Sequence, residues 1–304
     1  MNPEPAAPLD RPSGARLWLL AARPRTLPLA ATPVLVGTSL AWAQGAPPAW
    51  AAAIAALLAA MLIQIGTNLH NDAADFEHGN DGQQRLGPTR VTAAGWASPR
   101  QVRGAAALAF GLAFLLGLYL AVRGGWPIVA SGLASLAGGW AYSDGPRPIS
   151  HSPFGEVFVL VFFGLVAVGG SHYLQSGAIS PAALLAGAAI GAPAAAVLMV
   201  NNLRDLVADT AAGRRTLAAV VGDGGARRIH AALVLAPFVL LPGFVPTARP
   251  GAWLALLALP MAIVLLRHAR RATGVAFNRV LADTARTQFI FGLLFAIGCL
   301  PPSP

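Results

Sequence analysis

The chain has 304 residues, of which 56% are hydrophobic and 11% are charged, and its formal net charge is +9. A soluble domain carries roughly 25% charged residues, so this composition excludes an ordinary globule in water and favours a protein embedded in a lipid bilayer. Basic loops on the cytoplasmic side of a membrane explain the positive charge, so we expect no nucleic-acid partner. The single cysteine, Cys299, excludes a disulfide framework and a cysteine-rich metal site.

We expect the first 20 residues to form a polar, proline-rich segment with no cleavable signal peptide, and residues 21–304 to form one membrane domain. A spanning helix requires about 20 consecutive, mostly apolar residues. Nine such segments follow, at residues 27–43, 49–70, 104–122, 126–142, 154–173, 181–203, 229–246, 251–267 and 287–301. The sequence therefore predicts an all-α membrane protein with nine transmembrane helices around a central cavity.

The arginines provide an independent check of this topology. With nine spans and a cytoplasmic N-terminus, all of the 21 basic residues except Arg123 and Arg249 fall on the cytoplasmic side. Basic loops of membrane proteins show this bias. Most acidic residues lie at the same helix ends, so we expect a multi-pass protein of the bacterial inner membrane whose chemistry takes place at its cytoplasmic mouth.

A first group of polar residues lies at the end of the second predicted span. Its members, Asn68, Asn71, Asp72 and Asp75, occupy positions i, i+3, i+4 and i+7, which share one face if the helix continues. Carboxylates one turn apart repel each other and are costly to bury near lipid unless a counter-charge neutralises them. Hard oxygen ligands favour Mg²⁺ as that counter-charge.

A second group lies at the cytoplasmic end of the sixth predicted span. Asn201, Asp205 and Asp209 recur at i, i+4 and i+8, again on one face of a continuous helix. Between them, the two groups could hold two or three Mg²⁺ ions whose coordination a diphosphate completes. Guanidinium groups near the two clusters are candidate diphosphate ligands. These are Arg85, Arg90, Arg204, Arg214 and Arg215.

These motifs give the chain a resemblance to the UbiA superfamily of intramembrane prenyltransferases. Four segments carry it: AARPRTLPLAATPVLVG at 21–37, NLHNDAADFEHGND with GPTRVTAAGWASP at 68–99, YSDGPRPISHSPFGEVFVLVFFG at 142–164, and NNLRDLVADTAAGRRTLAAVVG at 201–222. The resemblance is greatest to the members of menaquinone biosynthesis. It implies that a polyprenyl group is transferred from polyprenyl diphosphate to 1,4-dihydroxy-2-naphthoate with decarboxylation, giving demethylmenaquinone.

The resemblance also implies a set of site residues. Metal ligands acting through Mg–diphosphate would be Asn68, Asn71, Asp72, Asp75, Asp81, Asn201, Asp205 and Asp209. Catalytic residues would be Asp72, Asp75, Asp205, Asp209 and Tyr142, and Arg23 and Arg25 are candidates for binding the acceptor. The family more often has Gly, Tyr and Lys where this chain has Asp144, His151 and Arg214.

Two alternatives stay open at this point. A UbiA-type enzyme could use another aromatic acceptor, because the departures at Asp144 and His151 lie in the segment that would line the acceptor pocket. A membrane transporter could also carry intramembrane carboxylates. Transporters place these groups near the bilayer midplane, however, and here they lie at one mouth.

Overall fold

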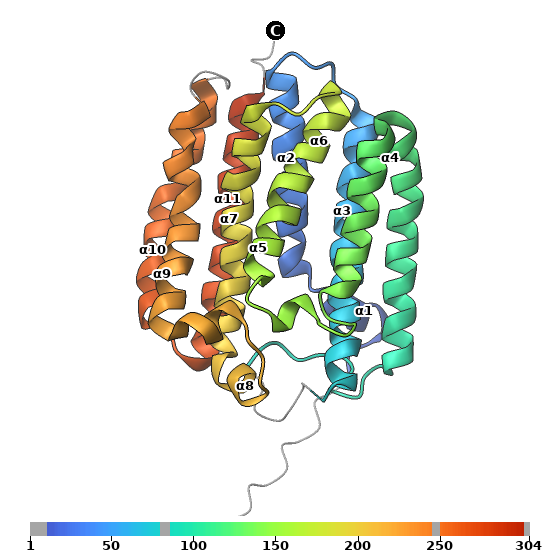
Figure 1. Ribbon diagram of the computed structural model, residues 1–304, viewed down its shortest axis with the longest axis vertical. Coiled ribbons are helices and arrows are strands. Elements are labelled where there is room, and N and C mark those ends of the chain that lie inside the picture. The colour runs from blue at the N-terminus through green and yellow to red at the C-terminus, as the bar shows by residue number, and fades with distance from the viewer. Residues whose placement is uncertain (1–10, 80–85, 245–249, 301–304) are drawn as a thin grey trace, which may run out of the picture.

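The computed structural model describes residues 11–79, 86–244 and 250–300, and the regular elements in these ranges are helices (Figure 1). Their bounds are α1 Gly14–Ala22, α2 Leu27–Ala43, α3 Trp50–Glu77, α4 Pro99–Ala141, α5 Gly155–Leu160, α6 Ala167–Ser176, α7 Pro181–Arg204, α8 Leu206–Ala211, α9 Leu217–Leu240, α10 Leu259–Arg271 and α11 Phe277–Cys299. A π-helical turn, Val161–Val166, joins α5 to α6, and a 3-10 stretch, Pro250–Ala258, leads into α10. The expectation of an all-α fold is therefore confirmed.

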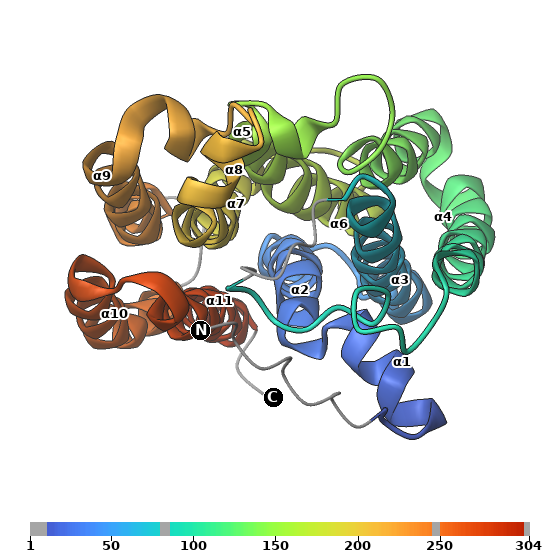
Figure 2. The ribbon, with the colours of Figure 1, turned by 90° about the horizontal axis from the view of Figure 1, so that it is seen from below.

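Eight helical stretches in the described ranges are long and apolar enough to cross a membrane. The difference from the predicted nine arises at α4, whose 43 residues include both the third and the fourth predicted spans. A straight helix of that length would extend about 65 Å, twice the thickness of the hydrocarbon core. Gly125 breaks it, with φ 62° and ψ −154°, and the end-on view shows the two halves of α4 as separate helices (Figure 2).

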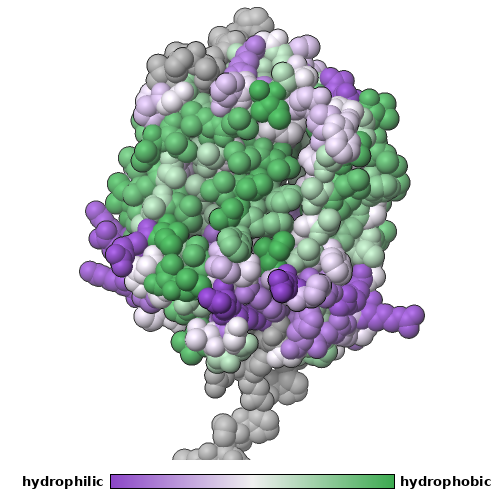
Figure 3. Space-filling view, in the orientation of Figure 1, coloured by the Kyte–Doolittle hydropathy of each residue, from purple (hydrophilic) through white to green (hydrophobic). Residues whose placement is uncertain are grey.

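The surface is divided between apolar and polar zones. Hydrophobic side chains cover the middle of the molecule, including the exposed Leu108, Leu115 and Val122 of α4. Hydrophilic residues gather in a band at the lower end, where α1 and α8 lie (Figure 3). Soluble proteins rarely expose an apolar surface of this extent, whereas it matches the hydrocarbon interior of a bilayer. The chain is therefore a multi-pass membrane protein.

Helix α7 lies at the centre of the bundle, and small residues allow its neighbours to approach closely. A Cβ atom on Gly164 would lie 2.3 Å from the carbonyl oxygen of Gly187, and one on Gly191 would lie 2.5 Å from the carbonyl oxygen of Leu160. Backbones that touch in this way are typical of helix pairs in membranes. The close contact fixes the stretch 155–166 against α7, whose last turn carries part of the second polar group.

Replacing Gly125 by Ala should destabilise the protein by about 1–3 kcal/mol, because an L-residue is strained at that combination of φ and ψ. Thermal unfolding in detergent measures the loss. Gly117→Ala is the matched control, since Gly117 lies inside α4 and a Cβ there meets no atom within 4 Å. Equal stability of the two variants would contradict a conformational requirement at Gly125.

Candidate functional site

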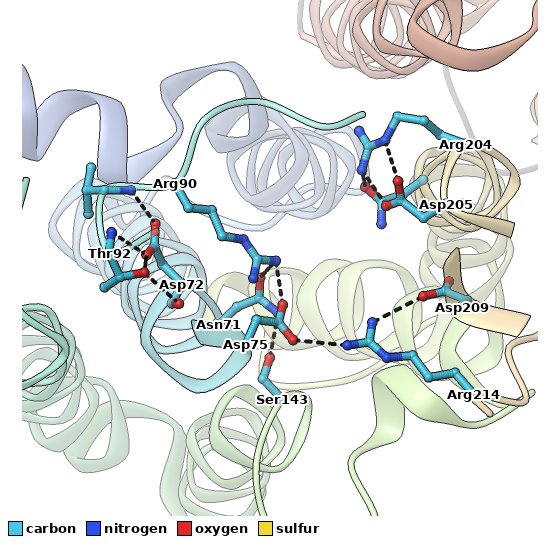
Figure 4. Close-up of polar contacts among 12 residues, drawn as sticks. Asn71, Asp72, Asp75, Arg90, Thr92, Ser143, Arg204, Asp205, Asp209 and Arg214 are labelled. Atoms are coloured by element: carbon cyan, nitrogen blue, oxygen red, sulfur yellow. Dashed lines mark hydrogen bonds and ion pairs between the residues drawn. The ribbon is translucent and has the colours of Figure 1, made fainter. Parts of the chain in front are cut away.

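The first polar group is helical, as predicted, because α3 continues to Glu77. Asn71 donates a hydrogen bond from Nδ2 to Ser143 Oγ at 2.8 Å, and its Oδ1 accepts one from Arg90 Nη2 at 2.9 Å. Asp75 forms ion pairs with Arg90 and, at 3.5 Å, with Arg214. The ends of Asn71 and Asp75 thus face two guanidinium groups at the polar end of the bundle (Figure 4).

Asp72 has a different environment, although it lies on the same helix. One carboxylate oxygen accepts the backbone N–H of Val91 at 3.1 Å. The other accepts both the backbone N–H of Thr92, at 3.1 Å, and the Thr92 hydroxyl. Asp72 is 2% exposed. Its hydrogen-bonding capacity is therefore used to hold the segment that follows Arg90.

Asn68 also binds the chain itself. Its Nδ2 donates to the carbonyl oxygen of Ala22 and to Thr26 Oγ1, both at 3.0 Å, and its Oδ1 accepts from Gln64 at 3.2 Å. These bonds join α3 to the turn between α1 and α2. The four residues that share one helical pattern thus serve two purposes: Asn71 and Asp75 face the arginines, whereas Asn68 and Asp72 fasten neighbouring segments.

The second polar group does not form one continuous helical face, and that expectation was wrong. Helix α7 ends at Arg204, Asp205 adopts φ −96° and ψ 5°, and Asp209 belongs to the separate short helix α8. The chain turns at Asp205 because this residue departs from helical geometry, while its carboxylate pairs with the side chain of the preceding Arg204. Asp209 therefore approaches the first group from a separate element.

Arg204 is a buried organiser of the second group. Its guanidinium donates to Asp205 at 2.9 and 2.6 Å, to Asn201 Oδ1 at 2.8 Å and to Asn278 Oδ1 at 2.9 Å. Its side chain is 3% exposed. With these partners the guanidinium is largely occupied by the protein itself, whereas Arg90 and Arg214 contact the buried carboxylates of Asp75 and Asp209.

Arg214 joins the two polar groups. One nitrogen, Nη2, lies 3.5 Å from Asp75 of α3, and the other, Nη1, lies 3.2 Å from Asp209 of α8 (Figure 4). A backbone bond from Arg214 N–H to the carbonyl oxygen of Asp209 adds to the contact. Carboxylates from two distant parts of the sequence therefore face the same cation.

The ionisation of Asp209 is unusual. Burial, against the opposing charge of Arg214 and together with the neighbouring charge of Asp205, raises its pKa from 3.8 to about 6. The carboxylate is therefore easily protonated and gains from any added positive charge. A group tuned in this way at a junction of two polar clusters is typical of a functional site.

Tyr142, a predicted catalytic residue, lies beside this junction. Burial raises the pKa of its phenol, as do the charges of Glu156 and Asp75, whereas the charge of Arg23 lowers it. The phenol therefore keeps its proton near neutral pH. Arg23 itself has a left-handed backbone, φ 53°, which among non-glycine residues of the described ranges occurs only there.

The other predicted residues have plainer surroundings. Arg25 and Arg215 are exposed, and Asp81 and Arg85 lie outside the described residues. His151 lies near Arg214, and burial together with that positive charge lowers the pKa of the imidazole. The assignment of catalytic and ligand roles stays a prediction.

Several residues near the site were not anticipated. Thr92 and Ser143 bind members of the first polar group, Asn278 binds Arg204 beside the second, and Asn202 donates to the buried carboxylate of Glu156 at 2.9 Å. Contacts such as those of Asn278, which lies more than 70 residues from Arg204, have no signal in local spacing. Asn202 could have been noticed, because it adjoins Asn201 in the second motif.

The oxygen donors of the two polar groups suit a metal ion that takes its remaining ligands from water and substrate phosphates. Within the described ranges, no group of three or more His, Cys, Asp or Glu residues lies close enough to hold a metal ion alone. Mg²⁺ commonly binds one or two carboxylates and takes its other ligands from water and substrate phosphates. The oxygens of Asn71, Asp75 and Asp209, which already face cationic groups, fit that arrangement.

Sequence comparisons extend these observations. The model of the UbiA prenyltransferase family matches residues 30–281. The chain is 37% identical over 281 residues to the 1,4-dihydroxy-2-naphthoate octaprenyltransferase of Mycobacterium tuberculosis (strain ATCC 25618 / H37Rv), covering 92% of this chain and 95% of that protein. It is 36% identical over 296 residues to the 1,4-dihydroxy-2-naphthoate octaprenyltransferase of Escherichia coli (strain K12), covering 94% and 96%.

Solved structures share the fold at lower identity. A UbiA homolog from Aeropyrum pernix K1, in its apo form, superposes with a TM-score of 0.71 and 19% identity over 90% of this chain and 98% of that one. A UbiA homolog from Archaeoglobus fulgidus bound to DMAPP and Mg²⁺ gives 0.62 and 14% over 92% and 99%. The helical arrangement is therefore common to all three proteins.

Replacing Arg214 by Gln should lower stability by about 1–3 kcal/mol at pH 8, because the buried Asp209 carboxylate loses its cation. The pKa of Asp209 is higher in the folded chain than its ordinary value of 3.8, so ionising it costs stability as the pH rises to about 6, and the cost is constant above that. Thermal unfolding at pH 5 and pH 8 measures the difference, which should shrink at pH 5.

Arg215→Gln is the matched control, since Arg215 is the exposed next residue. Its stability should change by less than about 0.5 kcal/mol at either pH. A loss for Arg214→Gln that is equal at both pH values would contradict the ion pair with Asp209.

Proposed function

The chain belongs to the UbiA prenyltransferase family, and we propose that it transfers a polyprenyl group from polyprenyl diphosphate to 1,4-dihydroxy-2-naphthoate with loss of CO₂, giving demethylmenaquinol, the hydroquinone form of demethylmenaquinone. The observation that carries the proposal is the convergence of Asp75 and Asp209 on Arg214 at the polar end of an apolar bundle. Relatives of that activity match this chain over nearly its whole length.

The proposal includes a topology. Helix α4 crosses the membrane twice, turning back at Gly125, which gives nine crossings in one membrane domain that follows the polar N-terminal segment. The N-terminus and the arginine-rich end then face the cytoplasm of a bacterial inner membrane. This orientation places the charged diphosphate group at the cytoplasmic surface, while the hydrocarbon tail stays in the bilayer.

The diphosphate end of the substrate binds at the junction of the two polar groups. Asp75 and Asp209 would hold Mg²⁺, with Asn71, Asn201 and Asp205 as further oxygen donors. Arg90 and Arg214, which already lie beside these carboxylates, would bind the diphosphate, since guanidinium groups bind phosphate oxygens in bidentate fashion. When bound, the metal stabilises the negative charge of the departing diphosphate. Asp72, Asn68 and Arg204 support this site indirectly, because they bind the neighbouring segments of the chain.

The acceptor binds on the side of Tyr142 and Arg23. The protonated phenol of Tyr142 donates a hydrogen bond to an acceptor oxygen, and the Arg23 guanidinium pairs with the carboxylate. The allylic carbon–oxygen bond breaks, and its electron pair leaves with the diphosphate. The ring carbon that bears the carboxylate then attacks the allylic carbon. Finally the bond between the ring and the carboxylate breaks, CO₂ leaves, and the electron pair of that bond restores the aromatic ring. The apolar bundle excludes water from the allylic cation.

Asp75→Asn and Asp209→Asn should each lower the rate of prenyl transfer by at least about 100-fold, because each removes a charge that would hold the metal–diphosphate. Membranes containing the protein are supplied with Mg²⁺, octaprenyl diphosphate and 1,4-dihydroxy-2-naphthoate, and the prenylated product and CO₂ are quantified. Asp223→Asn is the control, since Asp223 is exposed and pairs with Arg227 instead.

The same assay tests the acceptor. Homogentisate and 4-hydroxybenzoate are offered separately, because Asp144 and His151 depart from the family in the segment beside Tyr142. Rapid transfer to either of them with none to dihydroxynaphthoate would replace the acceptor but keep the reaction class. Normal turnover by either aspartate variant would reject the metal assignment.

The binding of Mg–pyrophosphate should weaken as the pH falls below about 6, by up to about tenfold per unit, since the proton on Asp209 must leave before the cation binds. Calorimetric titrations between pH 5 and pH 8 measure this dependence. Pyrophosphate also takes up protons, so the comparison is with Asp209→Asn, whose binding should be weaker but less dependent on pH. Equal pH dependence in both proteins would contradict the role of Asp209.

A further inference from the structure

The segment 86–98 runs across the polar end of the bundle, between the end of α3 and the start of α4 (Figure 2). It carries Arg90, which is 6% exposed and contacts both Asn71 and Asp75. Two backbone bonds close a turn directly after it, from Ala94 N–H to Arg90 O and from Trp96 N–H to Val91 O. The segment is therefore a compact support for one arginine.

One attachment of this segment lies directly after Arg90. The Asp72 carboxylate accepts the backbone N–H groups of Val91 and Thr92 as well as the Thr92 hydroxyl. Val91 also packs with Leu69 and Ala73 of α3 in a buried apolar cluster. Three hydrogen bonds to one buried carboxylate fix the direction in which the chain presents the Arg90 side chain.

The second attachment of the segment is to helix α11. Asn278 Nδ2 donates to the carbonyl oxygen of Leu86 at 2.8 Å, and Asn278 Oδ1 accepts from Arg204 Nη1 at 2.9 Å. Arg204 in turn holds Asn201 and Asp205. Through Asn278, at the start of α11, the segment is thus connected to the second polar group.

We infer that residues 86–98 form a strap fastened to both polar groups, and that Asp72 and Asn278 are positioning residues that hold Arg90 at the diphosphate site. The inference deepens the proposed function and rests on it for the identity of the ligand. A flexible loop would lose the entropy of ordering Arg90 each time the diphosphate bound. A strap fastened at both sides has that side chain in place beforehand.

The test combines the variants Asp72→Asn, Thr92→Val and Asn278→Ala with an Arg90→Ala background. In the otherwise unaltered protein each single variant should weaken the binding of Mn²⁺–pyrophosphate by about tenfold or more. In the Arg90→Ala background the same change should cost less than about twofold, because the group that it positions is gone. Titration calorimetry of the full chain in nanodiscs measures all of these affinities.

Hydrogen exchange supplies a readout that does not depend on prenyl transfer. The amides of residues 86–98 should exchange about tenfold faster in each single variant, while those of α7 keep their rates. Arg279→Gln is the matched control for Asn278→Ala, since Arg279 is the exposed next residue of α11. It should alter neither the exchange nor the affinity.

Each part of the inference can be rejected by a separate result. A loss for Asp72→Asn that persists in the Arg90→Ala background would make Asp72 a direct ligand of the metal and overturn its positioning role. Unchanged exchange in Asn278→Ala would remove the second attachment. Thr92→Val keeps the test decisive if Asp72→Asn does not fold, because it removes only a hydroxyl. Absent prenyl transfer with the expected affinities and exchange would reject the proposed function but retain the strap.

Discussion

The structure depends on the neutralisation of carboxylates at the edge of an apolar bundle. Asp75 and Asp209 are buried carboxylates whose charge is costly to bury without a nearby cation, and Arg214 contacts both. Helix α3 has to continue past the apolar belt to bring Asp75 there, and the chain has to turn after α7 to bring Asp209 there. The positions of the surrounding segments follow from this meeting of charges.

Similar residues in one motif have acquired different tasks. Asn68 and Asp72 share the helical pattern of Asn71 and Asp75, yet their polar atoms bind neighbouring backbone, hydroxyl and amide groups of the chain. Arg204 differs from Arg214 as well, since its own side chain is only 3% exposed and its guanidinium binds Asn201 of α7 and Asn278 of α11. Whether a polar atom retains capacity for a ligand therefore depends on its partners, and the residue type alone does not reveal it.

Local periodicity explains which features could be predicted. The spacing of Asn68, Asn71, Asp72 and Asp75 indicates one helix, and α3 confirms it, whereas the equally regular spacing of Asn201, Asp205 and Asp209 conceals a turn at Asp205. Runs of apolar residues predicted where the helices lie. The third and fourth predicted spans, however, belong to one element, α4, which is broken at Gly125. Thr92 and Asn278 were missed because their contacts join segments far apart in the chain, where spacing carries no information.

The glycine contacts between the stretch 155–166 and α7 restrict how a long isoprenoid could lie in this protein. Gly164 approaches the backbone of Gly187 so closely that a single methyl group would collide there. No hydrocarbon chain fits in a seam that excludes a methyl group. The tail of a membrane-borne substrate therefore cannot leave the bundle at the point where Gly164 and Gly187 touch.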